Sequence, residues 1–320
     1  MHPDSARALK ARILEQLPSA PAVASDVGTG APWPWVAVGL APDAEGGARV
    51  AVRLQRDGDR ALLPDLGRAA AAELDVRVIG RVRAFSSPTP DQLQQRVRPL
   101  RPGLSIAHPS VTAGTLGGFV RTGSGLAILS NNHVLAASDA ATVGDAVLQP
   151  GPYDGGRPED RVATLAAFQR FRQGQPNLVD AAVATLDDGV YADPGDVPGG
   201  PLTGAVPAAA DVDPDEPVEK IGRTTGHTRG VITAVEVDAV AVQYDEVVHR
   251  FDDQIEIQGA TGAFSAGGDS GSVIWRSRDR APMGLLFAGS TEGGSAGGGV
   301  TFANPLATVL GTFDAVWVAR

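Results

Sequence analysis

The sequence predicts a mainly β chain with a small α+β domain in front, and three observations lead to this fold class. From about residue 113 to residue 302, short apolar stretches alternate with glycine-rich turns, which is typical of antiparallel barrels. The first 85 residues instead mix helix-like and strand-like patterns. A length of 320 residues with 43% hydrophobic residues is enough for two or three domains with a sizeable core.

The front domain is predicted to span residues 1–85. Its expected elements are a helix, two strands, an Ala-rich helix and a last strand, at 1–16, 35–40, 48–54, 66–74 and 75–85. The first helix is amphipathic, with Leu9, Ile13 and Leu14 on one side. The last strand alternates apolar and basic residues, so one face is expected in solvent, and a basic contact face is the alternative. Nothing in this region carries catalytic chemistry.

The rest of the chain is predicted to hold a linker, two β-rich regions and a final helix. Pro, Ser, Gln and Arg are frequent over 86–112, which is typical of a segment that lies over a surface. The first β region, a Pro/Gly-rich connection, the second β region and the helix follow, at 113–190, 191–216, 217–302 and 303–320. We expect Asn304 to cap this helix and Pro305 to occupy its first position.

The most informative stretch, residues 267–272, reads Gly-Gly-Asp-Ser-Gly-Ser. A serine among glycines can lie on a tight loop with its hydroxyl exposed, and glycine lets a substrate carbonyl approach backbone N–H groups. A serine nucleophile beside an oxyanion hole requires both features. Because the chain has 40 glycines, a flexible surface turn is the alternative, and suitably placed histidine and aspartate residues decide between the two.

Among the five histidines, His133 is the candidate general base. It follows the apolar run 126–129 and the tripeptide Ser-Asn-Asn, and a further apolar segment comes after it. An imidazole held by packing at the end of a strand has the fixed orientation that a general base needs. A core histidine with both ring nitrogens satisfied is the alternative. His227, in a Gly/Thr-rich turn, is the other candidate base.

Asp180 is the candidate partner of that histidine. It is the single carboxylate within the apolar stretch 177–186, and buried carboxylates need a dedicated partner. A histidine N–H is such a partner, since the carboxylate then fixes the tautomer and stabilises the imidazolium. An aspartate that caps a turn at the end of the strand is the alternative.

The order His133, Asp180, Ser270, with Gly-Asp-Ser-Gly around the serine, resembles that of the chymotrypsin-like serine peptidases. Residues 220–230 are similar to the Gly-Thr-Thr-Gly segment that opens the second barrel in bacterial members, and residues 114–118 are similar to the start of the first barrel. The resemblance is strongest to bacterial trypsin-like peptidases with a small N-terminal domain, which are relatives of the plant narrow-leaf peptidase. It covers about 100–320 and, more loosely, 30–100.

This resemblance implies a chymotrypsin-like double β-barrel and a role for each motif residue. Ser270 would be the nucleophile, His133 the base and Asp180 its orienter, and the N–H groups of Gly268 and Ser270 would form the oxyanion hole. Phe264 would lie at the base of the primary pocket, whose wall would come from Ala288, Gly289 and Ser290. No acidic residue stands at the base position, so a small or apolar side chain is expected before the scissile bond.

Composition limits the partners and the compartment. The chain has no cysteine, which excludes disulfides and favours the cytosol. A formal net charge of −10 argues against nucleic acid or an anionic membrane as a partner. No apolar run has the length of a signal peptide or a membrane span. No histidine pair has metal-ligand spacing and no phosphate-binding loop is present, so neither a metal nor another cofactor is expected.

The sequence therefore predicts a serine endopeptidase that acts on protein or peptide substrates through a covalent acyl-enzyme. Two alternatives stay open: a peptide-binding or scaffold module that retains the triad in a restrained form, and an esterase that uses the same triad. The front domain could gate the cleft, bind a dedicated protein partner or support a homo-oligomer.

Overall fold

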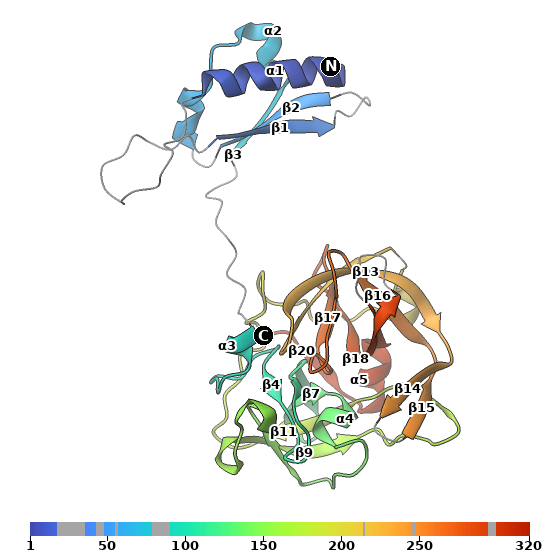
Figure 1. Ribbon diagram of the computed structural model, residues 1–320. Coiled ribbons are helices and arrows are strands. Elements are labelled where there is room, and N and C mark those ends of the chain that lie inside the picture. Colours follow the sequence, from blue (N-terminus) through green and yellow to red (C-terminus); the bar gives the residue numbers. More distant parts are fainter. Residues whose placement is uncertain are drawn as a thin grey trace. The chain divides into compact units, whose positions relative to one another are not determined.

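The computed structural model describes residues 1–17, 36–42, 48–54, 57–78, 90–213, 215–244, 247–293 and 299–320 (Figure 1). The chain divides into two compact units, Met1–Phe85 and Ser86–Arg320. In the described ranges no helix is long and apolar enough to cross a membrane.

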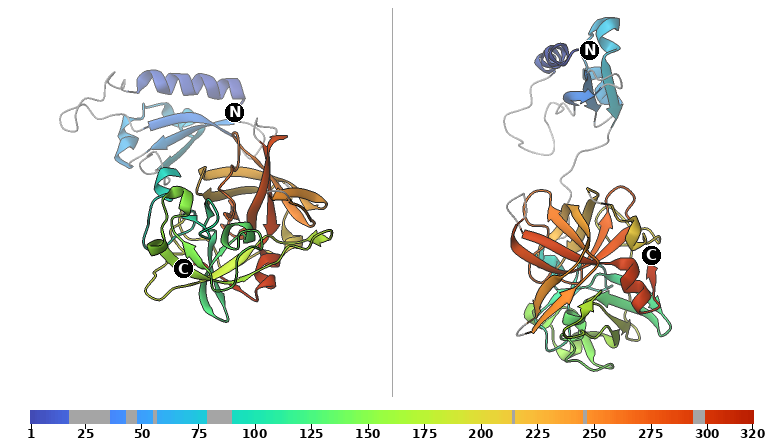
Figure 2. Two further views of the ribbon diagram at one scale, coloured as in Figure 1. Left: turned by 60° about the horizontal axis from the view of Figure 1, so that its bottom comes forward. Right: turned by 90° about the vertical axis from the view of Figure 1, so that its right-hand side faces the viewer.

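The N-terminal unit is a helix packed on a three-stranded sheet (Figure 2). Its elements are α1 (Pro3–Gln16), β1 (Val36–Pro42), β2 (Ala48–Leu54), a 3₁₀ turn (Asp57–Leu62), α2 (Gly67–Ala71) and β3 (Leu74–Val78). β2 pairs antiparallel with β1 and parallel with β3. Ala6 and Ile13 of α1 are fully buried, whereas Leu14 is 46% exposed, so the apolar face of the helix differs from the prediction by this residue. Residues 79–85 of the predicted last strand lie outside the described residues.

The first β region of the C-terminal unit is a six-stranded antiparallel sheet in the order β20-β6-β7-β11-β9-β8. These strands are β6 (Gly118–Thr122), β7 (Gly125–Ser130), β8 (Ala146–Leu148), β9 (Arg161–Phe168), β11 (Ala182–Leu186) and β20 (Val316–Val318). Short 3₁₀ turns at Pro152–Asp154 and Pro158–Asp160 lie between β8 and β9. The last strand of the chain thus completes an edge of the first β region.

The second β region is a closed antiparallel barrel in the order β12-β13-β16-β19-β18-β17 (Figure 1). Its strands are β12 (Pro217–Gly222), β13 (Gly226–Val237), β16 (Gln254–Gly259), β17 (Val273–Arg276), β18 (Pro282–Gly293) and β19 (Gly299–Pro305). A 3₁₀ turn, Ala209–Asp211, precedes it. Inward-facing apolar residues fill the barrel, among them Val218, Ile232, Ile257, Phe264 and Leu286. The prediction of a mainly β fold behind an α+β domain is confirmed.

A hairpin, β14 (Val240–Tyr244) and β15 (Val247–Phe251), leaves the barrel between β13 and β16. β15 pairs in parallel with β10 (Pro176–Asn177), which belongs to the connection between β9 and β11 of the first β region. The hairpin therefore carries residues of the second β region next to Asp180.

The predicted linker is wrong over 90–112, where the chain is part of the core. This stretch holds α3 (Pro90–Leu93) and β4 (Ser105–Ile106), and β4 pairs with β5 (Gly114–Thr115). Its apolar side chains are fully buried, including Leu93, Leu100, Leu104 and Ile106. The Pro- and Arg-rich composition hid these widely spaced leucines and isoleucine, whose burial fixes the segment. Residues 86–89 lie outside the described part of the chain.

The C-terminal helix is also shorter than predicted. α5 spans Leu306–Thr312, and Pro305 occupies its N-cap position. Asn304 does not cap the helix, because its side chain binds the backbone N–H of Asp180 and the side chain of Gln254.

Substitution of Gly118 by alanine should destabilise the C-terminal unit. The indole ring of Trp317 in β20 lies against Gly118 of β6, so a Cβ there would overlap this rigid ring. Such overpacking costs about 1–3 kcal/mol in the free energy of unfolding, measurable by urea denaturation. Gly123→Ala is the matched control, since nothing lies within 4 Å of its added Cβ. Equal stability of the two variants would contradict this packing.

Candidate active site

His133 and Asp180 are brought together by the pairing of β7 with β11. Ala182 of β11 lies opposite Ser130 of β7. His133 follows Ser130 by three residues, in the short helix α4 (Asn132–Leu135), and Asp180 precedes Ala182 by two residues. The pairing therefore places both side chains at the same end of the two strands. His133 Nδ1 lies 2.5 Å from Asp180 Oδ2, and the His133 backbone N–H donates to Asp180 Oδ1 at 3.2 Å. The carboxylate therefore holds both the ring and the backbone of this histidine.

Asp180 is fully buried and has polar partners on every side. Besides His133, the Tyr244 hydroxyl donates to Asp180 Oδ2 at 2.8 Å. Asn304 Oδ1 accepts the Asp180 backbone N–H at 3.0 Å, and Asn131 Nδ2 donates to the Asp180 carbonyl at 2.7 Å. Burying a charged carboxylate is costly unless it is hydrogen-bonded; His133 and Tyr244 bind the carboxylate oxygens, and the two asparagines bind the backbone of Asp180.

Ser270 lies on a loop of the second β region that is held against the first. The Thr115 backbone N–H donates to the Ser270 carbonyl at 2.8 Å, and Thr115 Oγ1 donates to the Gly268 carbonyl at 2.9 Å. Gly271 has a φ of 95°, and a Cβ on it would overlap Ser130 Oγ and the Thr115 carbonyl. Only glycine lets the loop approach Ser130 so closely. Ser130 ends β7 and precedes His133 by three residues.

Three polar groups near Ser270 have no hydrogen-bond partner among the described residues. His133 Nε2 has no hydrogen-bond partner among the described residues, and no hydrogen bond joins it to Ser270 Oγ. Within the same described ranges, the backbone N–H groups of Gly268 and Ser270 have no acceptor. Hydrogen bonds between a serine and its base are often long in the absence of substrate, and two unpaired backbone N–H groups are able to donate to an anionic oxygen.

Asp269, immediately before Ser270, forms a second buried carboxylate site. Its Oδ2 lies 3.3 Å from Lys220 Nζ, and both side chains are fully buried. The backbone N–H groups of Thr224, Thr225 and Ala266 also donate to this carboxylate. Burial lowers the pKa of Lys220, and the charge of Asp269 opposes that shift. The pair holds the loop that carries Ser270 against β12.

Sequence reasoning missed Lys220. It is one of only two lysines in the chain and stands in the apolar stretch 217–222, which was a usable signal for a buried cation. Its partner, Asp269, lies 49 residues later in the sequence, and the strand pairing of the barrel brings the two residues together.

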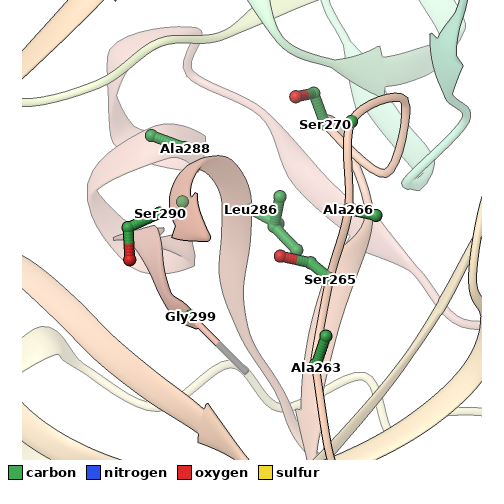
Figure 3. A pocket seen from close by; sticks show the side chains of 10 residues that line it. Ala263, Ser265, Ala266, Ser270, Leu286, Ala288, Ser290 and Gly299 are labelled. Atoms are coloured by element: carbon green, nitrogen blue, oxygen red, sulfur yellow. The ribbon is translucent and has the colours of Figure 1, made fainter. Parts of the chain in front are cut away.

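A cavity of about 420 Å³ opens beside Ser270 (Figure 3). In Figure 3 the segment with Ala263 and Ser265 lies across the cavity from Ala288 and Ser290. The lining residues are Ala263, Ser265, Ala266, Gly267, Ser270, Leu286, Ala288, Gly289, Ser290 and Gly299. None of these described lining residues carries a charge. Ser265 Oγ also lies 2.7 Å from Thr301 Oγ1, which places a hydroxyl pair next to the wall.

Phe264 is not at the base of this cavity, which corrects the prediction. It is 1% exposed and belongs to the barrel core. Neighbouring residues of an extended segment point to opposite sides, so Ala263 and Ser265 face the cavity while Phe264 faces the core. The predicted wall residues Ala288, Gly289 and Ser290 do line the cavity.

The other candidate base has a different partner. His227 Nε2 lies 2.6 Å from Glu219 Oε2, and its ring stacks on Trp275 with a centroid distance of 5.8 Å. It belongs to the paired strands β12 and β13 rather than to the Ser270 loop. In the described part of the chain, no cluster of three or more His, Asp or Glu side chains could hold a metal ion.

No protein-family model and no curated protein matches the sequence. Solved structures do match: the chymotrypsin of Cellulomonas bogoriensis is 18% identical with a TM-score of 0.46, covering 69% of this chain and 100% of its own. Protease A of Thermobifida fusca is 18% identical with a TM-score of 0.47 at the same coverage. The Nocardiopsis protease is 18% identical with a TM-score of 0.48, covering 68% of this chain and 99% of its own. Identities this low leave the activity open, and the fold is taken from the strand order of the chain itself.

Replacement of Lys220 by methionine should strongly destabilise the C-terminal unit. The buried Asp269 carboxylate would lose the ammonium group that pairs with it, and breaking a buried ion pair from one side costs about 3–5 kcal/mol. Urea unfolding followed by tryptophan fluorescence measures the loss. Adding Asp269→Asn should restore part of it, because neither charge is then buried alone. Lys10→Met, in the N-terminal unit, is the control for loss of a lysine; a Lys220→Met protein of wild-type stability would refute the pair's role.

Proposed function

We propose that this protein is a serine endopeptidase with Ser270 as nucleophile, His133 as general base and Asp180 as the residue that orients the base. The observation that carries the proposal is the 2.5 Å contact between His133 Nδ1 and the buried Asp180 carboxylate. A base oriented in this way, next to a serine loop with two unpaired N–H groups, has the parts that acyl transfer needs.

The reaction follows from these roles. Ser270 Oγ attacks the scissile carbonyl carbon while His133 Nε2 takes the hydroxyl proton, and Asp180 stabilises the imidazolium through the Nδ1–H bond. The N–H groups of Gly268 and Ser270 donate to the oxyanion of the tetrahedral intermediate. His133 then gives its proton to the leaving amine, which departs and leaves an acyl-enzyme. A water molecule, deprotonated by His133, releases the acyl group and restores the serine.

The cavity beside Ser270 supports a preference for a small or apolar side chain before the scissile bond. Its walls are built mainly from Ala, Gly and Ser side chains, with Leu286 as the largest apolar group. A Lys or Arg side chain would find no carboxylate among the described lining residues, and burying its charge unpaired would be costly.

The proposed reaction implies protein or peptide substrates. The composition bears on the compartment in which the protein would act. The absence of cysteine supports a reducing compartment such as the cytosol.

Two other functions compete with this proposal. A restrained binding or scaffold module would bind peptides without cleaving them, and an esterase would use the same residues on ester substrates. Turnover of a casein panel separates the first from the endopeptidase. A comparison of amide and ester substrates with the same acyl group separates the second.

Ser270→Ala should abolish both hydrolysis and labelling by a fluorophosphonate probe, because the other serine of this loop, Ser272, is fully buried and its hydroxyl donates to the Asp269 carbonyl. Ser124→Ala removes an exposed hydroxyl on the β6–β7 turn and serves as the matched control. Labelling is read by mass spectrometry of the intact protein. A Ser270→Ala variant that still reacts at the wild-type rate would exclude the mechanism.

Digestion of a random peptide library should give cleavage after small or apolar residues. The expected products are identified by mass spectrometry, with Ser270→Ala protein as the blank. A strict preference for Arg or Lys before the cleaved bond would show that the cavity beside Ser270 does not select the substrate as proposed.

A further inference from the structure

The β14–β15 hairpin delivers an aromatic hydroxyl to the carboxylate that orients His133. The hydroxyl of Tyr244 donates to Asp180 Oδ2 at 2.8 Å. The same oxygen lies 2.5 Å from His133 Nδ1. Tyr244 comes from the second β region, whereas Asp180 and His133 belong to the first, so the bond joins the two regions at the reacting centre.

We propose that Tyr244 is a positioning residue for the reaction, acting on His133 through Asp180; this rests on the proposed peptidase function. Oδ1 of Asp180 is held by the His133 backbone N–H at 3.2 Å. The Tyr244 hydroxyl holds Oδ2 from another direction. With both oxygens held, the carboxylate cannot rotate about its χ2 angle, and the imidazole keeps one orientation toward Ser270.

The ring of Tyr244 is itself held firmly. Its centroid lies 5.0 Å from that of Phe171, 5.8 Å from His249, 6.2 Å from Phe251 and 5.5 Å from His133. The pairing of β15 with β10 fixes the hairpin that carries it. A hydroxyl on a packed ring loses little entropy when it binds, so the position of the donor is set before substrate arrives.

Tyr244 acts as a donor and not as an acid. Burial raises its pKa well above the ordinary tyrosine value, and the neighbouring Asp180 charge raises it further. The hydroxyl therefore stays protonated at neutral pH. The titratable groups that face it are Asp180, His133 and His249.

The charge on Asp180 Oδ2 is shared between two donors, and this gives the proposal a signature. If the hydroxyl is removed, the full charge of that oxygen acts on His133 Nδ1–H and favours the imidazolium, so the pKa of His133 rises. The carboxylate also becomes free to turn, so the chemical step slows. Tyr244 does not line the cavity beside Ser270, so substrate binding should change little.

The test compares Tyr244→Phe with Tyr191→Phe, which removes a hydroxyl from an exposed ring away from the site. For Tyr244→Phe we expect kcat to fall about tenfold or more with KM nearly unchanged, since a hydrogen bond to a charged group is lost. The rising limb of the pH profile should move to higher pH. The pKa of His133, measured by NMR titration of its ring Cε1–H, should rise in the protein without substrate.

A ring-fluorinated tyrosine at position 244 provides a second variant that keeps the shape and the hydroxyl. Fluorine strengthens the donor, so the pKa of His133 should shift in the opposite direction, below the wild-type value. This comparison keeps the test informative if Tyr244→Phe folds poorly.

The outcomes are distinct. If Tyr244→Phe keeps the wild-type kcat, pH profile and His133 pKa, the positioning role is refuted. If the wild-type protein neither hydrolyses peptides nor reacts with a fluorophosphonate, the proposed function fails. The NMR titration then still decides whether Tyr244 acts on His133, because it needs no turnover.

Discussion

The burial of the Asp180 carboxylate is the constraint on which the rest of the site depends. A carboxylate removed from water must be surrounded by donors, and those donors have to come from several segments. His133 at the end of β7 and Tyr244 on the hairpin of the barrel donate to this carboxylate, whereas Asn304 from β19 accepts the backbone N–H of Asp180. Together these contacts fix the positions of the three segments relative to one another, and the imidazole orientation follows from them.

The C-terminal unit holds a second buried carboxylate and stabilises it in a different way. Asp269 is neutralised by the ammonium group of Lys220, whereas Asp180 has only His133 and neutral donors. The difference matches what each carboxylate is proposed to do. A permanent cation suits Asp269, which only holds a loop, but the same cation beside Asp180 would cancel the field that stabilises the imidazolium during turnover.

The sequence predicted the residues that have local signals. His133 and Ser270 stand at the ends of apolar strands or between glycines, and Asp180 interrupts an apolar stretch, so each was found from its neighbours. Tyr244 carries no such signal, and the apolar stretch around Lys220 indicates a buried cation but not its partner, because the partners of these residues lie 64 and 49 residues away and meet them only through strand register. The wrong linker and the wrong pocket residue also depend on tertiary packing. The prolines of 90–112 indicated a linker, but the leucines of the same stretch are buried. Phe264 was placed in the pocket, but a shift of one residue along an extended chain reverses the direction of a side chain.

The site is a property of the packing between the two β regions rather than of either alone. The first region supplies the proposed base and its carboxylate, and the second supplies the loop with Ser270, which Thr115 and the close approach of Gly271 hold against the first. The last strand of the chain, β20, returns from the barrel to pair with β6. The sheet that carries His133 is therefore complete only once the C-terminal end of the chain has joined it, so the proposed site depends on the folding of the whole unit.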